Sequence, residues 1–173
     1  DVRMVEGELR LSHDIPEDAD ACVTLRECFS LVAPEENLHM NIDVKTEGLL
    51  VPVIELAREF SLEKRIIFTG ACNDDRSLAL SLGSDVWRSM WPGQEIADGI
   101  AANKKDGSPF LNVAYCMITE ENNKALCESG GGFSAWTVDK TYFLRLFLGM
   151  GIANITTRNP VKAMELRKEI QGL

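Results

Sequence analysis

The run His39-Met40-Asn41-Ile42-Asp43-Val44-Lys45 begins a strand-then-helix unit from which the fold class is predicted. The run itself predicts a strand of the kind found in parallel sheets. The apolar residues that follow recur at i, i+3, i+4 and i+7, which predicts an amphipathic helix: Leu50, Val53, Ile54 and Ala57. Pro52 falls in the first turn of that helix, where proline is tolerated. One strand followed by one helix is the repeating unit of a parallel α/β sheet.

The same alternation runs along the whole chain. Strands are expected near residues 1–4, 9–13, 66–69, 85–90, 111–117, 133–138 and 152–156. Helices are expected near residues 24–32, 75–82, 96–103, 120–128 and 140–148, with a last helix capped by Asn159 and opened by Pro160. Repeated βα units predict an α/β fold, the (β/α)₈ TIM barrel.

Chain length predicts one domain over residues 1–173, because 173 residues suffice for a single hydrophobic core. A closed barrel needs eight strands and about 200 to 250 residues, and the pattern contains one barrel strand too few. We therefore expect the chain to lack the first βα unit of its barrel.

Composition excludes several classes of protein. A formal charge of −9 argues against binding to nucleic acid, and no apolar run approaches the roughly 20 residues of a membrane span. The five cysteines form no CxxC pair and are interpreted as buried small hydrophobes in a reducing compartment, so a cytoplasmic location is expected. The expected partner is a small molecule, and a homo-oligomer remains open.

Polar residues gather where barrel enzymes carry their active sites, at the carboxyl ends of strands. The period of two places Asn41, Asp43 and Lys45 on one face of their strand. This strand end places an acid and a lysine at the barrel mouth, and the lysine suits an anionic substrate oxygen. The alternative is a structural ion pair. His39 has the same parity but lies near the other end of the strand, and it is interpreted as packing.

A hairpin turning symmetrically about Gly7 would set Asp1 opposite His13. Two carboxylates, Asp1 and Asp43, in one mouth suit a hard divalent cation such as Mg²⁺ or Ca²⁺. The alternative for His13 is a surface histidine beside a turn, with Asp14 next to it.

Trp136, near the end of its predicted strand, is a candidate wall of a substrate pocket, although packing is the alternative. Asn112 and Tyr115 are weaker candidates. The end of the last strand, residues 156–158, is where barrels often hold phosphate; the alternative is that Thr157 and Arg158 only lead into the helix.

Several pieces in order resemble the glycerophosphodiester phosphodiesterase family. They are Asp1-Val2-Arg3, then Gly7 and Ser12-His13-Asp14, the run Asn41 to Lys45, the run Ala135 to Asp139, and the run Gly151 to Pro160. The family has a (β/α)₈ barrel with a small insertion. It cleaves deacylated phospholipids to glycerol 3-phosphate and an alcohol.

The resemblance implies a role for each matching residue. Asp1 would be the second acid of a Glu-x-Asp metal motif and Asp43 the third metal ligand, where the family usually has Glu. His13 would be one of two acid/base histidines, which cleave the diester through a cyclic phosphate. Lys45 would contact the phosphate, whose charge the metal and the lysine neutralise.

The chain departs from the family at its front, because the first-strand His-Arg motif and the Glu two residues before Asp1 have no counterpart. Two alternatives therefore stay open. One is a catalytically inactive barrel of the same family that binds a phosphorylated ligand or partner. The other is a lysophospholipase D-type activity, which needs an apolar groove at the mouth.

Overall fold

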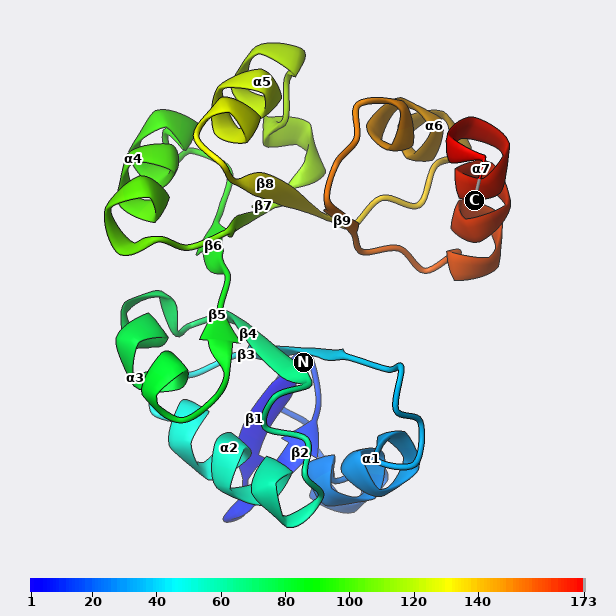
Figure 1. Cartoon of the computed structure of the whole chain (residues 1–173). Coiled ribbons are helices and arrows are strands. Elements are labelled where there is room, and N and C mark those ends of the chain that lie inside the picture. The colour runs from blue at the N-terminus through cyan, green and yellow to red at the C-terminus, as the bar shows by residue number, and fades with distance from the viewer. Residues whose placement is uncertain (173) are drawn as a thin grey trace. The chain divides into compact units, whose positions relative to one another are not determined.

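The computed structural model describes residues 1–172, which divide into two compact units, one of residues 1–87 and one of residues 88–172. These N-terminal and C-terminal units each contain one sheet with its own helices (Figure 1). Within each unit the strands and helices alternate, as the sequence predicts. No helix within residues 1–172 is both long enough and apolar enough to cross a bilayer.

The N-terminal unit has a five-stranded sheet in the order β2-β1-β3-β4-β5. Its strands are β1 (Val2–Val5), β2 (Glu8–Leu11), β3 (Met40–Val44), β4 (Ile66–Gly70) and β5 (Asp85–Val86). All are parallel except β2, which returns antiparallel to β1. β1 pairs with β3 through Val2 and Val44, so β1 begins beside the carboxyl end of β3. This offset brings Asp1 to that edge of the sheet.

The β1–β2 hairpin differs by one residue from the predicted register. Val2 pairs with Leu11, and Glu6-Gly7 is the two-residue turn. Both turn residues have positive φ, 52° and 83°, as a type I′ turn requires. The prediction that Asp1 and His13 lie opposite one another is therefore wrong, because the centre of the hairpin falls between residues 6 and 7. A shift of one residue exchanges the faces on which side chains lie.

Three helices cover this sheet: α1 (Leu25–Val32), α2 (Leu50–Glu59) and α3 (Arg76–Ser81). α1 starts as predicted at Thr24, whose hydroxyl accepts from the Glu27 backbone while the Glu27 carboxylate accepts from the Thr24 backbone. The core contains the apolar side chains of one sheet face, among them Val2, Ile42, Val44 and Phe68. The alternate residues Asn41, Asp43 and Thr69 therefore project from the opposite face.

The C-terminal unit has a parallel four-stranded sheet in the order β6-β7-β8-β9. The strands are β6 (Arg88–Met90), β7 (Phe110–Ala114), β8 (Gly132–Trp136) and β9 (Asn154–Ile155). The single strand predicted over residues 85–90 is thus two short strands, β5 and β6, in different sheets. The predicted strand over 111–117 ends at Ala114, and a short 3₁₀ turn follows.

Side chains from four neighbouring strands form a polar ladder across this sheet. Asn112 Nδ2 donates to Ser89 Oγ at 3.3 Å, and Asn112 Oδ1 accepts from Ser134 Oγ at 2.9 Å. Asn154 Nδ2 donates to Ser134 Oγ at 2.9 Å. Both ends of the Asn112 amide are used inside the sheet, so this weaker candidate site residue is a structural residue.

The helices of this unit are α4 (Ile96–Asp106), α5 (Glu120–Glu128), α6 (Thr141–Gly149) and α7 (Pro160–Gln171), close to the predicted ranges. Tyr115, another weaker candidate, packs its ring against Phe143 and Phe147 of α6. α7 begins at Pro160 as predicted, but the Asn159 side chain does not cap it. Asn159 Nδ2 instead donates to the carbonyl oxygen of Asp139 at 3.2 Å.

All five cysteines are free, in keeping with the absence of a predicted disulfide framework. Their predicted burial holds for Cys72, whereas Cys22 and Cys28 are half-buried. Cys116 and Cys127 are exposed, so the prediction is wrong for these two.

Candidate active site

Two carboxylates and one ammonium group meet at the carboxyl end of β3. Lys45 Nζ lies 2.8 Å from Asp1 Oδ1 and 2.6 Å from Asp43 Oδ2, so the ammonium bridges the two acids. The Lys45 side chain is 21% exposed, and the acids are about one-third exposed. The structure therefore brings together three of the predicted site residues. We call Asp1, Asp43 and Lys45 the carboxylate–lysine cluster.

Strand register accounts for this cluster. In the parallel register Val2 lies beside Val44, so Asp1 falls beside Asp43, and the Lys45 side chain reaches both acids from the end of β3. Asp43 and Lys45 share a face because side chains alternate along β3. The face is the one opposite the helices, so the three charged groups avoid the apolar core.

The neighbouring strand β4 supplies two further residues that sequence reasoning missed. Thr69 lies opposite Asp43 in the register, and its Oγ1 atom is 3.0 Å from Asp43 Oδ1 and 2.9 Å from Asn41 Oδ1. Gly70 has φ of +90°, and a Cβ atom there would overlap the Val44 carbonyl oxygen. A glycine after an apolar strand is the signal that could have marked this close approach.

Burial raises the pKa of the Cys72 thiol to about 12, and the nearby carboxylates of Asp75 and Asp43 add to this effect. The Cys72 Sγ atom lies 3.4 Å from the Thr69 carbonyl oxygen. A thiol with so high a pKa is not a nucleophile near neutral pH. Cys72 is therefore a packing residue beneath the cluster.

His13 follows β2 and is held by its main chain. The Arg3 guanidinium donates to the His13 carbonyl oxygen through Nε at 3.1 Å and Nη2 at 2.9 Å. The imidazole Nδ1 lies 3.0 Å from Asp14 Oδ1, and the ring is 71% exposed. Arg3, which the sequence did not single out, is thus the residue that anchors His13. No hydrogen bond or ion pair within residues 1–172 joins the imidazole to the carboxylate–lysine cluster.

His39, predicted to pack, is exposed just before β3. The prediction failed because β3 begins only at Met40, so the alternation of strand faces does not extend to residue 39.

Trp136 ends β8 in the C-terminal unit and is half-buried. Its indole Nε1 atom is buried without a hydrogen-bond partner in the described chain. A buried donor without a partner is rare in folded proteins, so this N–H is an exception that calls for an explanation.

Asp139 ties the ends of β8 and β9 together. Its Oδ1 atom accepts from the Arg158 backbone at 2.8 Å and the Thr157 hydroxyl at 3.3 Å, and its Oδ2 atom accepts from Arg158 Nη1 at 2.9 Å. These hydrogen bonds, led by the one from the Arg158 backbone, lower the pKa of Asp139. The alternative interpretation of Thr157 and Arg158, as residues that lead into α7, fits these contacts.

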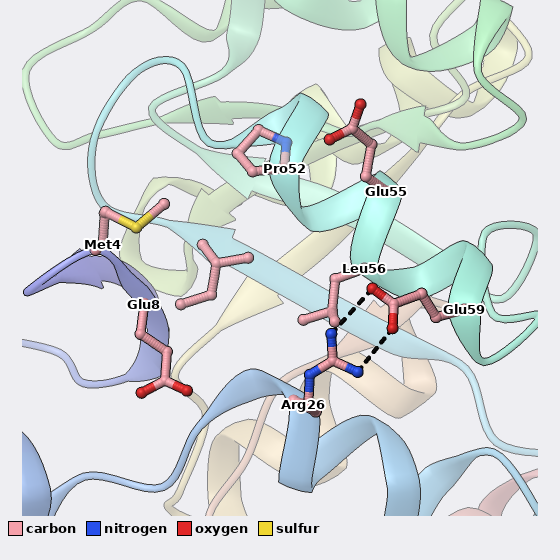
Figure 2. Close-up of a pocket in the computed structure, with 9 residues that line it drawn as sticks. Met4, Glu8, Arg26, Pro52, Glu55, Leu56 and Glu59 are labelled. Carbon is pink, nitrogen blue, oxygen red and sulfur yellow. Dashed lines mark hydrogen bonds and ion pairs between the residues drawn. The ribbon is translucent and has the colours of Figure 1, made fainter.

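A separate groove of about 370 Å³ lies where the β1–β2 turn meets α1 and α2 (Figure 2). A bidentate ion pair spans this groove: Arg26 Nη1 and Nη2 donate to the two Glu59 carboxylate oxygens at 2.7 and 2.9 Å. None of the predicted site residues lines this groove. Arg26 and Glu59 in this groove neutralise one another, so the carboxyl ends of the strands remain the candidate active site.

Comparison with known proteins begins with two negatives: no protein-family model and no curated protein matches the chain. Solved structures do match. A glycerophosphodiester phosphodiesterase from Parabacteroides distasonis shares 16% identity over 97% of this chain and 82% of its own, with a TM-score of 0.79. An Agrobacterium tumefaciens protein named for glycerophosphoryl diester phosphodiesterase activity shares 16% identity over 99% and 85%, with a TM-score of 0.85.

A third match is an Oleispira antarctica phosphodiesterase solved with its product sn-glycerol-3-phosphate. It shares 14% identity over 84% of this chain and 61% of its own, with a TM-score of 0.64. Identities this low establish shared architecture, and they confirm the predicted α/β class of the TIM-barrel type. The chain has the fold of the solved glycerophosphodiester phosphodiesterases.

Proposed function

We propose that the chain belongs to the glycerophosphodiester phosphodiesterase family and hydrolyses glycerophosphodiesters to glycerol 3-phosphate and an alcohol. One observation carries the proposal: Lys45 bridges Asp1 and Asp43 at the carboxyl end of β3. This is the edge at which barrel enzymes carry their active sites. The fold shared with phosphodiesterases, one of them bound to sn-glycerol-3-phosphate, supports the same reaction class.

Lys45 is proposed to contact the phosphoryl oxygens. Its ammonium is a mobile point charge on a long stem, which suits an anionic oxygen at variable distance. In the structure this charge is neutralised by two acids. A ligand that draws Lys45 away leaves Asp1 and Asp43 free to bind a cation, so anion and cation binding support one another.

A hard divalent cation, Mg²⁺ or Ca²⁺, is the proposed cofactor. Two carboxylates are a donor set that fits Mg²⁺, which keeps several waters and takes its remaining ligands from substrate phosphate. Within residues 1–172 no group of three His, Cys, Asp or Glu side chains could hold a metal ion, so the cation would depend on water and substrate. Asp1 and Asp43 would hold it. A bound cation would supply charge neutralisation at the phosphoryl oxygens.

His13 is proposed as an acid/base group. Its exposed ring can exchange protons with water and substrate, and Asp14 beside Nδ1 favours the tautomer with a proton on that nitrogen. Nε2 is then the atom that takes or gives a proton. Trp136 is proposed to bind substrate through its unpaired indole N–H. A cytoplasmic location accompanies the proposal, and a homo-oligomer stays open.

The test is turnover by the purified chain. Glycerophosphocholine and glycerophosphoethanolamine are supplied with Mg²⁺ or Ca²⁺, and release of glycerol 3-phosphate is followed by a coupled dehydrogenase assay. Lys45→Met should lower kcat/KM by about 10²-fold, in the range for loss of one charge-stabilising group. Lys64→Met, at an exposed lysine of the same unit, is the matched control. Absence of turnover on both substrates would favour an inactive barrel that only binds.

A groove in the C-terminal unit favours a second candidate, the lysophospholipase D-type activity. It has a volume of about 730 Å³, and apolar residues of α4 and α5 line it, among them Ile96, Ile100 and Ala125. Residues 92–95, which follow β6, and Cys116, Met117 and Thr119, which follow β7, also line it. Ala125→Trp would fill this groove. If the groove holds an acyl chain, this variant loses lysophosphatidylcholine turnover and keeps glycerophosphocholine turnover.

A further inference from the structure

The Thr69 hydroxyl lies between two side-chain oxygens. Its Oγ1 atom is 2.9 Å from Asn41 Oδ1 and 3.0 Å from Asp43 Oδ1, and Thr69 is only 1% exposed. A hydroxyl has one proton and therefore donates to one acceptor at a time. With both neighbours acting as acceptors, one of these two contacts would be a repulsion between oxygens in a buried position.

The carboxylate takes the proton, because a hydrogen bond to an ionised acceptor is shorter and stronger than one to an amide oxygen. The contact with Asn41 is then favourable only if its amide is turned so that Nδ2, and not Oδ1, faces Thr69. The two ends of an amide are similar in size, so this rotation needs no other movement.

We propose that Asn41 and Thr69 form a hydrogen-bond relay that orients the Asp43 carboxylate: Asn41 Nδ2 donates to Thr69 Oγ1, which donates to Asp43 Oδ1. Thr69 is thus a positioning residue for the proposed cation ligand. This inference rests on the proposed function only where it concerns the cation.

The relay controls which oxygen Asp43 presents. With Oδ1 held by Thr69, Oδ2 is directed at Lys45 Nζ, 2.6 Å away. The relay crosses two paired strands: Asn41 and Asp43 lie on β3, and Thr69 lies on β4 as the register partner of Asp43. Loss of the Thr69 hydroxyl lets the carboxylate rotate and spread its charge over several orientations.

Cation affinity tests the relay without any turnover measurement. Mn²⁺ binding to the full chain is measured by competition with a fluorescent chelator. Thr69→Val keeps the side-chain shape and removes the hydroxyl donor. It should weaken Mn²⁺ binding by about 10- to 100-fold, the usual effect of removing a residue that hydrogen-bonds to a metal ligand. Thr69→Ser should restore binding to within about twofold. Asn41→Ala should fall between these two variants.

Ser84→Ala is the matched control, because Ser84 is a buried residue of the same unit whose hydroxyl donates to the Glu63 carbonyl oxygen at 2.7 Å. It should leave Mn²⁺ affinity unchanged. If Thr69→Val binds Mn²⁺ as the wild type does while Asp43→Asn does not, the relay has no role at the cation site and the proposal fails.

A double-mutant cycle tests the Thr69–Asp43 bond even if the chain binds no Mn²⁺. In urea unfolding, Thr69→Val should shift the folding equilibrium constant by about tenfold or more when Asp43 is present. The shift should drop to about twofold or less in the Asp43→Ala background. Equal shifts in both backgrounds overturn the relay. Failure of the proposed function has a different signature, which is a wild type that releases no glycerol 3-phosphate while the cycle still shows coupling.

Discussion

A Cβ atom on Gly70 would lie 2.8 Å from the Oδ1 atom of Asp43. The β4 backbone thus approaches the carboxylate so closely that only glycine fits, and its φ of +90° independently favours glycine. The position of Asp43 therefore depends on a residue that carries no functional group.

Gly70→Ala should damage both stability and the cluster. A Cβ atom at residue 70 would meet the Val44 carbonyl oxygen, which belongs to the backbone, and the Asp43 carboxylate, which is held by hydrogen bonds. Neither group can move away without a cost in free energy. We expect a loss of about 2 to 4 kcal/mol in the free energy of unfolding, measured by urea denaturation. Gly48→Ala separates the two causes, since Gly48 has φ of +80° but open space around it, and should cost only about 1 kcal/mol. Equal losses would contradict the close contact.

His13→Ala should lower kcat on glycerophosphocholine by about 10² to 10⁴, the usual contribution of a proton-transfer group. His39→Ala is the control, because His39 is exposed and belongs to no contact of the cluster. Steady-state kinetics on the two variants provides the check. An unchanged kcat in His13→Ala removes this histidine from the proposed mechanism.

Arg3→Leu should release the segment that carries His13. The two hydrogen bonds from the guanidinium to the His13 carbonyl oxygen are the contacts that hold this main chain. We expect the NMR order parameters of the backbone at residues 12–14 to fall, with little change in β3 and β4. Order parameters that stay at the wild-type values would show that other contacts position His13.

The cysteines should differ sharply in reactivity towards iodoacetamide at pH 8. With a pKa of about 12, Cys72 has roughly one thiolate in 10⁴ molecules at this pH, and its Sγ atom is also buried. Cys116 and Cys127 are exposed and should be alkylated first. Peptide mapping by mass spectrometry gives the order. Rapid labelling of Cys72 in the folded chain would contradict its burial.

Asp139 should make stability depend on acidic pH. Its pKa in the folded state is lowered, so its hydrogen bonds contribute fully above the unfolded-state pKa, near 3.9, and are lost as the pH falls through the lower folded-state value. Asp139→Asn should therefore differ from the wild type in urea unfolding at pH 6, with the difference shrinking towards pH 2.5. A constant difference across this range would count against the interpretation.

Much of the fold was predictable because local patterns decide it. The capping residues of α1 and the first-turn proline of α7 marked helix starts that the structure reproduces. The parity of Asn41, Asp43 and Lys45 followed from the two-residue period of a strand. Which residues of a strand share a face can be predicted without knowing the strands that pair with it.

The register of strand pairing was harder to predict from the sequence. The β1–β2 turn is centred between Glu6 and Gly7 and not on Gly7, a shift that reverses the expected facing of Asp1 and His13. The strand near residues 85–90 was divided between two sheets, because pairing partners, and not apolar pattern, decide where a strand ends. Asn159 lost its capping role to a competing acceptor, the Asp139 carbonyl oxygen.

Local sequence patterns are enough to predict the alternation of strands and helices, the faces on which side chains lie, and the acidic and lysine residues at the end of β3. Contacts between strands bring Lys45 to Asp1, Thr69 and Gly70 to Asp43, and Arg3 to His13, and no local pattern predicts them. The reason is physical: hydrogen bonds and close backbone approaches between strands depend on register, and register is set by all the paired strands together.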